Sequence, residues 1–174
     1  MPDPLTPPLG AADHVDGAAD APLELVMHGD FQCPFCAAAQ PILRRVRDRL
    51  GGRLRFAFRH VPLPEVHPDA ERAAEASEAA AAQGAFWPMH DALYGARGEL
   101  GIERVVALAG GLGLDPDRVR AELDAGVHAE RVARDRSSGE ATGVAGTPTF
   151  FVNGVRHPGA FDAQSLIAAL EAAA

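Results

Sequence analysis

The pattern of apolar and polar positions predicts two β-strands in the first third of the chain. The first, Leu23–Met27, is mostly apolar and is bounded by Pro22 and Gly29, which is typical of a short buried strand. The second, Leu54–Val61, alternates with a period of two, as a strand does when one of its faces packs on a core. We therefore expect both segments to belong to one sheet.

The residues between these two strands have the spacing of a helix. Apolar residues three or four positions apart share one face, whereas arginines dominate the opposite, solvated face. Gly51 and Gly52 follow directly, and glycine commonly ends helices. A strand, a helix and a strand in this order predict a βαβ unit with parallel strands and a right-handed crossover. The apolar face consists of Ile42, Leu43, Val46 and Leu50, and the basic face of Arg44, Arg45, Arg47 and Arg49.

From His67 to about Thr142 the chain becomes alanine-rich and helical in character. Glycine and proline separate this block into a first helix that starts at Pro68-Asp69 and several shorter ones. Residues 1 to about 20, in contrast, are rich in Pro, Gly, Ala and Asp and show no sustained periodicity. We expect them to form a flexible or loosely docked arm.

Strand character returns after the helical block. Thr147–Val152 is apolar and aromatic, and Asn153-Gly154 is a strong signal for a two-residue hairpin. Val155–His157 is the expected returning strand, and Asp162 is expected to cap a final helix. The order of elements is therefore βαβ, a helical block and ββα, which is an α/β fold class.

Composition limits the functions that are open to such a fold. The chain has 174 residues, 47% of them hydrophobic, and a formal net charge of -8. The acidic balance argues against nucleic-acid binding, which needs clustered cations. No stretch approaches the roughly 18 to 20 apolar residues of a membrane span. The first eight residues lack the charged and apolar regions of a secretory signal, so we expect a cytoplasmic location and no membrane partner. A periplasmic or exported location would require a truncated N-terminus.

The only two cysteines, Cys33 and Cys36, lie between the first strand and the first helix. Unpaired N–H groups and the helix dipole favour a thiolate at a helix N-terminus, and the thiolate is the form that exchanges disulfides. We expect Cys33 to be the more exposed sulfur and the nucleophile. Cys36, one turn later, would resolve the mixed disulfide. A pair of buried structural thiols, or half of a metal site shared across a dimer, remains an alternative.

No metal site is expected within one chain. Structural zinc takes four ligands, the chain supplies two thiolates, and the seven histidines do not follow a metal-binding spacing.

Three motifs together resemble the DsbA-like branch of the thioredoxin-fold superfamily. They are Gly29-Asp30-Phe31-Gln32-Cys33-Pro34-Phe35-Cys36, Phe86-Trp87 with Met89-His90-Asp91, and Gly146-Thr147-Pro148-Thr149-Phe150. The resemblance covers roughly residues 22 to 171. It implies a thioredoxin fold, βαβ…ββα, with an inserted all-helical domain. The implied domains are an arm at 1–20, a thioredoxin-like domain at 21–66 and 143–174, and a helical insertion at 67–142.

The resemblance also implies roles for individual residues. Pro148 would be a cis-proline that faces the cysteines, and the backbone of Thr147 would pair with an extended substrate. Thr147, Pro148 and Phe35 are therefore the expected substrate-binding residues. Strongly oxidising relatives often carry histidine where this chain has Phe35, so a less oxidising centre is expected. Many relatives carry a buried acid where this chain has Met27, so the proton of Cys36 would pass through water, His28 or His60.

The resulting prediction is a thiol–disulfide oxidoreductase that acts on thiols or disulfides of proteins or small molecules. No cofactor is expected, because the redox-active group would be the Cys33–Cys36 disulfide itself, with glutathione or a thioredoxin-type reductant as electron partner. Two other functions stay open. One is a glutathione-dependent transferase or isomerase of the kappa type, although those proteins usually carry serine in place of the catalytic cysteine. The other is a peptide-binding or chaperone-like module without turnover.

Overall fold

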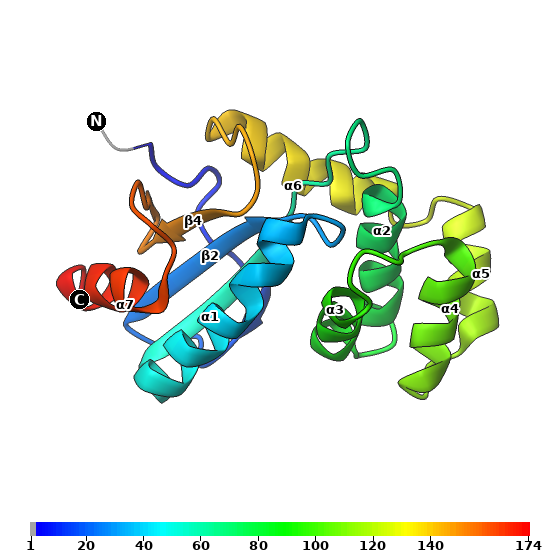
Figure 1. Cartoon of the computed structure of the whole chain (residues 1–174), viewed down its shortest axis with the longest axis horizontal. Coiled ribbons are helices and arrows are strands. Elements are labelled where there is room, and N and C mark those ends of the chain that lie inside the picture. The colour runs from blue at the N-terminus through cyan, green and yellow to red at the C-terminus, as the bar shows by residue number, and fades with distance from the viewer. Residues whose placement is uncertain (1–2) are drawn as a thin grey trace. The chain divides into compact units, whose positions relative to one another are not determined.

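A five-stranded sheet with the strand order β1-β3-β2-β4-β5 forms the centre of one part of the chain. The computed structural model describes residues 3–174, and Figure 1 shows β2 and β4 side by side. The pairs β1–β3, β2–β4 and β4–β5 are antiparallel. The strands are β1 His14–Asp16, β2 Leu23–Gly29, β3 Leu54–His60, β4 Thr149–Val152 and β5 Val155–Arg156.

The chain divides into two compact units, and the sheet belongs to the first. This unit contains the described residues up to Gly29, Ala38–Arg59 and Ser137–Ala174. The second unit contains Asp30–Ala37 and His60–Arg136. The turn that carries the cysteines therefore groups with the helices and not with the sheet. The expected domain boundaries instead placed residues 21–66 together in the thioredoxin-like domain, and those boundaries stay a prediction.

Helix α1, Pro34–Leu50, buries the apolar face that its spacing predicts. Leu43, Val46 and Leu50 of this helix are buried, whereas Ile42, predicted for the same face, is partly exposed. A short 3-10 turn, Gly51–Arg53, follows, and Gly51 has a φ of 53°, a conformation that glycine adopts without strain.

The last helix, α7 Ala163–Ala172, begins as its sequence predicts. The carboxylate of Asp162 accepts a hydrogen bond from the N–H of Ser165 at 3.0 Å, which satisfies an otherwise unpaired helix N-terminus. Leu166 and Leu170 are buried. The predicted order of βαβ, helical block and ββα is thus confirmed.

The N-terminal segment differs from the predicted arm. Strand β1 pairs with β3, and Leu5 is buried in a cluster with Val26, Ala57 and Phe151. A three-residue strand is too short to show a period, so its pairing was not visible in the sequence. Met1 and Pro2 of the expected arm lie outside the described residues.

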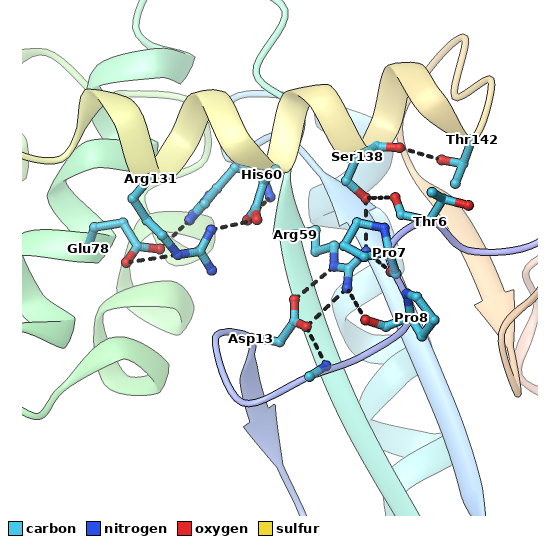
Figure 2. A network of polar contacts seen from close by, with 12 residues as sticks. Thr6, Pro7, Pro8, Asp13, Arg59, His60, Glu78, Arg131, Ser138 and Thr142 are labelled. Atoms are coloured by element: carbon cyan, nitrogen blue, oxygen red, sulfur yellow. Dashed lines mark hydrogen bonds and ion pairs between the residues drawn. The ribbon is translucent and has the colours of Figure 1, made fainter.

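A buried arginine also holds this segment, as Figure 2 shows. Arg59 at the end of β3 forms two hydrogen bonds with Asp13, at 2.8 and 3.0 Å. Its guanidinium also donates to the carbonyl oxygens of Pro7 and Pro8 and to Oγ of Ser138. Because a buried cation requires such compensation, Arg59 and the segment stabilise each other.

The second unit is helical. Alanines fill the buried side of α2, where Ala73, Ala76, Ala79 and Ala80 are inaccessible or nearly so, and such small side chains let neighbouring helices pack closely. None of the helices in residues 3–174 is long and apolar enough to cross a membrane. The helices are α2 Ala70–Ala81, α3 Phe86–Gly95, α4 Ile102–Gly111, α5 Pro116–Asp124 and α6 Ala129–Ala141, whose last turn and a half lies in the first unit.

Candidate redox site

Cys33 directly precedes the first residue of α1, and Cys36 lies in its first turn. Both are thiols in the structure. Cys33 is 3% exposed and Cys36 is fully buried, so the expected order of exposure holds by a narrow margin. Phe35 between them is 66% exposed. The turn therefore presents an apolar ring to solvent and keeps both sulfurs almost entirely covered.

The carboxylate of Asp30 organises the turn ahead of Cys33. One oxygen, Oδ1, accepts hydrogen bonds from the backbone N–H groups of Gln32 at 2.7 Å and Cys33 at 3.1 Å. The other, Oδ2, accepts from the N–H of Leu63 at 3.0 Å and contacts Nδ1 of His67 at 2.8 Å. Asp30 is buried, and these four contacts compensate its charge.

The side chain of Gln32 ties the same turn to the helices. Its carbonyl oxygen accepts a hydrogen bond from the N–H of Asp69 at 2.8 Å, at the start of α2. Its amide nitrogen donates to the carbonyl oxygen of Gly98 at 3.1 Å and to the carboxylate of Asp69 at 3.3 Å. Both residues that flank Phe31 are therefore anchored within the second unit, which fixes the backbone that leads into Cys33.

Tyr94 of α3 contacts the turn Asp30–Cys36, which we call the redox turn. Its hydroxyl donates a hydrogen bond to the carbonyl oxygen of Asp30 at 3.3 Å, and its side chain forms a hydrogen bond with that of Cys36. The pKa of the phenol lies well above its ordinary value because burial disfavours the phenolate, and because Cys36, Asp30 and Cys33 add negative charge nearby. Tyr94 therefore remains a neutral hydrogen-bonding group at this site.

An aromatic cluster lies beneath the turn. The Phe31 ring contacts the rings of Tyr94, His90 and His60, with centroids 5.0, 5.7 and 5.9 Å away. Trp87 packs edge-on against His90 at 5.1 Å. The ring of His90 contacts those of Phe86, Trp87 and Tyr94, so these aromatic side chains of α3 form one packed group.

His60 joins this cluster to a buried charged group, also shown in Figure 2. Its ring Nε2 lies 2.7 Å from a carboxylate oxygen of Glu78, and its backbone N–H donates to Asp135 at 3.0 Å. Arg131 forms an ion pair with Asp135 at 2.5 Å and lies 3.9 Å from Glu78. His60 ends strand β3, within the strand that the sequence predicts, and is fully buried.

The Thr147-Pro148 loop belongs to the first unit. The peptide bond between these residues is cis, and both side chains are partly exposed. Directly after it, Thr149 donates its hydroxyl to the carbonyl oxygen of Gly146 at 2.7 Å and pairs with His28 of β2. The cysteines belong to the other unit, so the expectation that Pro148 faces them stays a prediction.

The sequence suggested water, His28 or His60 as the acceptor of the proton of Cys36. Met27 is fully buried in β2. Burial, and then the charge of Arg59, lowers the pKa of His28 to about 3, so this imidazole is a poor proton acceptor at neutral pH. Its ring packs edge-on against Phe151 at 5.2 Å. Among the described residues 3–174, no group of three His, Cys, Asp or Glu side chains could hold a metal ion.

Comparisons with known proteins bear on the family and the fold of the chain. The family model described as a DSBA-like thioredoxin domain matches residues 24–171. The fold is similar to that of BdbD from Bacillus subtilis, with a TM-score of 0.86, 23% identity and coverage of 93% of this chain and 92% of that one. A thioredoxin-like oxidoreductase from Silicibacter pomeroyi gives a TM-score of 0.84 at 26% identity over 94% of this chain and 93% of that one. The predicted fold class is thereby confirmed.

Curated relatives of higher identity are much longer proteins. A protein from Salinispora arenicola named Na(+)/H(+) antiporter NhaA 1 is 45% identical over 161 residues, which is 92% of this chain and 24% of that protein. The chain thus spans about a quarter of the length of such relatives. The activity in their name is that of the whole protein.

Proposed function

Because the chain belongs to the family of DSBA-like thioredoxin domains, we propose that it is a thiol–disulfide oxidoreductase with Cys33 and Cys36 as its redox couple. The observation that carries this proposal is the position of the only two cysteines. They stand at the N-terminus of α1 in a turn anchored by Asp30 and Gln32. Such anchoring holds the sulfurs in place and avoids an entropic cost at each turnover.

Cys33 is the proposed nucleophile. In the reducing direction its thiolate attacks a substrate disulfide, a Cys33–substrate bond forms, and the other half of the substrate leaves as a thiolate. Cys36 then attacks Cys33, which forms the Cys33–Cys36 disulfide and releases the second substrate thiolate. The substrate gains two electrons and the protein loses them. The N-terminus of α1 favours the thiolate form of Cys33.

The substrate-binding residues are proposed to be Phe35, Thr147 and Pro148. Phe35 offers an exposed apolar ring next to the nucleophile, which suits a substrate with an apolar side chain beside its disulfide. The backbone of Thr147 would pair with an extended peptide, as the family resemblance implies. The substrate class is therefore a protein or small-molecule thiol or disulfide.

We propose the reducing or isomerising direction, with glutathione or a thioredoxin-type reductant as electron partner and the cytoplasm as compartment. Phe35 supports this direction because its ring can neither donate a hydrogen bond nor carry a charge that would stabilise the reduced thiolate.

Insulin reduction by dithiothreitol or glutathione tests the activity. The wild-type chain should accelerate the reaction, and Cys33→Ser should not. Cys36→Ala should accumulate a mixed disulfide with the substrate, because the resolving thiol is missing, and mass spectrometry would detect the adduct. An inactive wild type that traps no substrate as Cys36→Ala would instead favour a binding module. A glutathione transferase of the kappa type would conjugate or isomerise its substrate without needing Cys36.

A further inference from the structure

The resolving step needs a thiolate at Cys36, a side chain with no exposed surface. Burial disfavours the charged form of a thiol. A neighbouring group must therefore stabilise the sulfur of Cys36 as it loses its proton.

Asp30 cannot serve in this way. Its two carboxylate oxygens already face three backbone N–H groups and the ring of His67. A carboxylate has no proton to donate to a thiolate, and this one is fully used as an acceptor.

The hydroxyl of Tyr94 is placed to stabilise the sulfur of Cys36. It forms a hydrogen bond with the side chain of Cys36 and lies 3.3 Å from the carbonyl oxygen of Asp30. An O–H···O hydrogen bond usually spans about 2.7 to 2.8 Å, so the carbonyl holds the phenol proton weakly. A phenol has one proton and can also accept. The phenol proton can thus be donated either to the carbonyl oxygen of Asp30 or to the sulfur of Cys36.

We propose that Tyr94 is a further catalytic residue, whose hydroxyl donates a hydrogen bond to Sγ of Cys36 as this sulfur becomes the attacking thiolate. The proposal rests on the proposed oxidoreductase function. In the dithiol, the S–H of Cys36 donates to the phenol oxygen while the phenol O–H stays on the carbonyl of Asp30. When Cys36 gives its proton to water, the phenol O–H turns to the sulfur.

The electrons and protons of this step balance without oxidation of Tyr94. Sγ of Cys36 forms a bond to Sγ of Cys33, and the bond from Cys33 to the substrate breaks. The substrate leaves as a thiolate and takes a proton from water. Tyr94 only donates a hydrogen bond throughout.

The surroundings keep the phenol protonated. The groups that face it are the two cysteines, the anionic Asp30, the ring of His90 on its own helix at 5.1 Å, and the apolar ring of Phe31. Burial and the negative neighbours raise the pKa of Tyr94, so it remains a donor wherever Cys36 is a thiolate.

A two-step reaction with an aromatic disulfide separates the roles of the cysteines. The reduced 174-residue chain is mixed with an excess of a symmetric aromatic disulfide that releases a coloured thiolate. Attack by Cys33 releases the first equivalent, and attack by Cys36 on the resulting mixed disulfide releases the second. Stopped-flow absorbance then measures both rates in one experiment.

Tyr94→Phe should slow the second release about tenfold at neutral pH, as expected for a lost hydrogen bond to a charged group. The first release should be nearly unchanged. The control Phe86→Leu disturbs the same aromatic cluster without removing a hydroxyl, and it should leave the second release like that of the wild type. An unchanged second release in Tyr94→Phe, or equal slowing of both releases, would overturn the role of Tyr94. A wild type that releases no second thiolate would instead refute the proposed redox couple itself, and the role of Tyr94 with it.

A measurement on the wild type alone keeps the proposal testable if Tyr94→Phe does not fold. Tyr94 is the only tyrosine of the chain, so the ultraviolet absorbance of phenolate reports its ionisation alone. In the dithiol protein at high pH, a Cys36 thiolate raises the pKa of the phenol, and in the disulfide form this charge is gone. Oxidation should therefore lower the pKa of Tyr94. An equal pKa in both forms would overturn the contact.

Discussion

Replacing Asp30 with asparagine tests whether one buried carboxylate holds the redox turn. The change keeps the shape of the side chain and turns one oxygen into an NH₂ group. In either orientation of the amide, its NH₂ group then points at backbone N–H groups that need an acceptor. With NH₂ at the position of Oδ2, it opposes the N–H of Leu63, now 3.0 Å from an acceptor, while His67 can change tautomer and accept.

The magnitude follows from these contacts. A buried N–H left without an acceptor costs about 1 to 3 kcal/mol, and each hydrogen bond to a charged acceptor contributes about 1.5 to 3 kcal/mol. Asp30→Asn loses one such bond outright and weakens the others, so we expect about 2 to 5 kcal/mol of destabilisation. Asp30→Ala, which loses all four contacts, should destabilise more. A loss of this size is large beside a total stability of about 5 to 15 kcal/mol.

Urea unfolding of the reduced protein, followed by the fluorescence of Trp87, measures the difference. Trp87 is the only tryptophan and lies in the same unit as Asp30. Asp162→Asn is the matched control, because Asp162 is an exposed helix cap and asparagine caps about as well as aspartate, so its effect should stay within about 0.5 kcal/mol. An Asp30→Asn protein as stable as this control would refute the reasoning.

Two further substitutions test the first unit. Neither ring nitrogen of His28 has a hydrogen-bond partner within residues 3–174, and its pKa is lowered to about 3. Since the unfolded chain binds this proton below about pH 6.5, the wild type should lose about 1.4 kcal/mol per pH unit from His28 as the pH falls toward 3. Urea unfolding between pH 7 and about 4 should show a shallower loss for His28→Leu, and identical slopes would contradict the assignment. Arg59→Met leaves Asp13 buried without its cation and should cost about 3 to 5 kcal/mol and expose residues 3–20 to proteolysis. Arg47→Met, which breaks an exposed pair with Asp16, should cost less than about 1 kcal/mol, and equal effects of the two arginine variants would show that the buried contact has no special weight.

Local patterns carried the sequence analysis where it succeeded. The strands, the helices and the position of the cysteine pair depend on residues a few positions apart, and the structure confirms them. Asp30 accepts the N–H of Cys33, three positions along the chain. Its contacts with Leu63 and His67 join residues more than 30 positions apart, and no local pattern reveals such pairs.

The contact between Tyr94 and Cys36 could not be predicted from local patterns either. At helical spacing, a tyrosine that packs and a tyrosine whose hydroxyl reaches a cysteine produce one apolar pattern. Only the fold distinguishes them, because α3 and the turn before α1 meet within the second unit. The anchoring of residues 3–20 was missed for a related reason, since Arg59 and Asp13 are far apart in sequence.

The redox equilibrium of the Cys33–Cys36 couple tests the central claim most directly. The 174-residue chain is equilibrated with glutathione buffers of increasing oxidising strength, and the fraction of disulfide is measured by thiol alkylation and mass spectrometry. We predict a single two-electron transition to one intramolecular disulfide, with a potential more negative than about -180 mV, on the reducing side of strong periplasmic oxidants near about -120 mV. A potential near that of those oxidants would contradict the proposed direction. Failure to form the Cys33–Cys36 disulfide in any buffer would contradict the oxidoreductase itself.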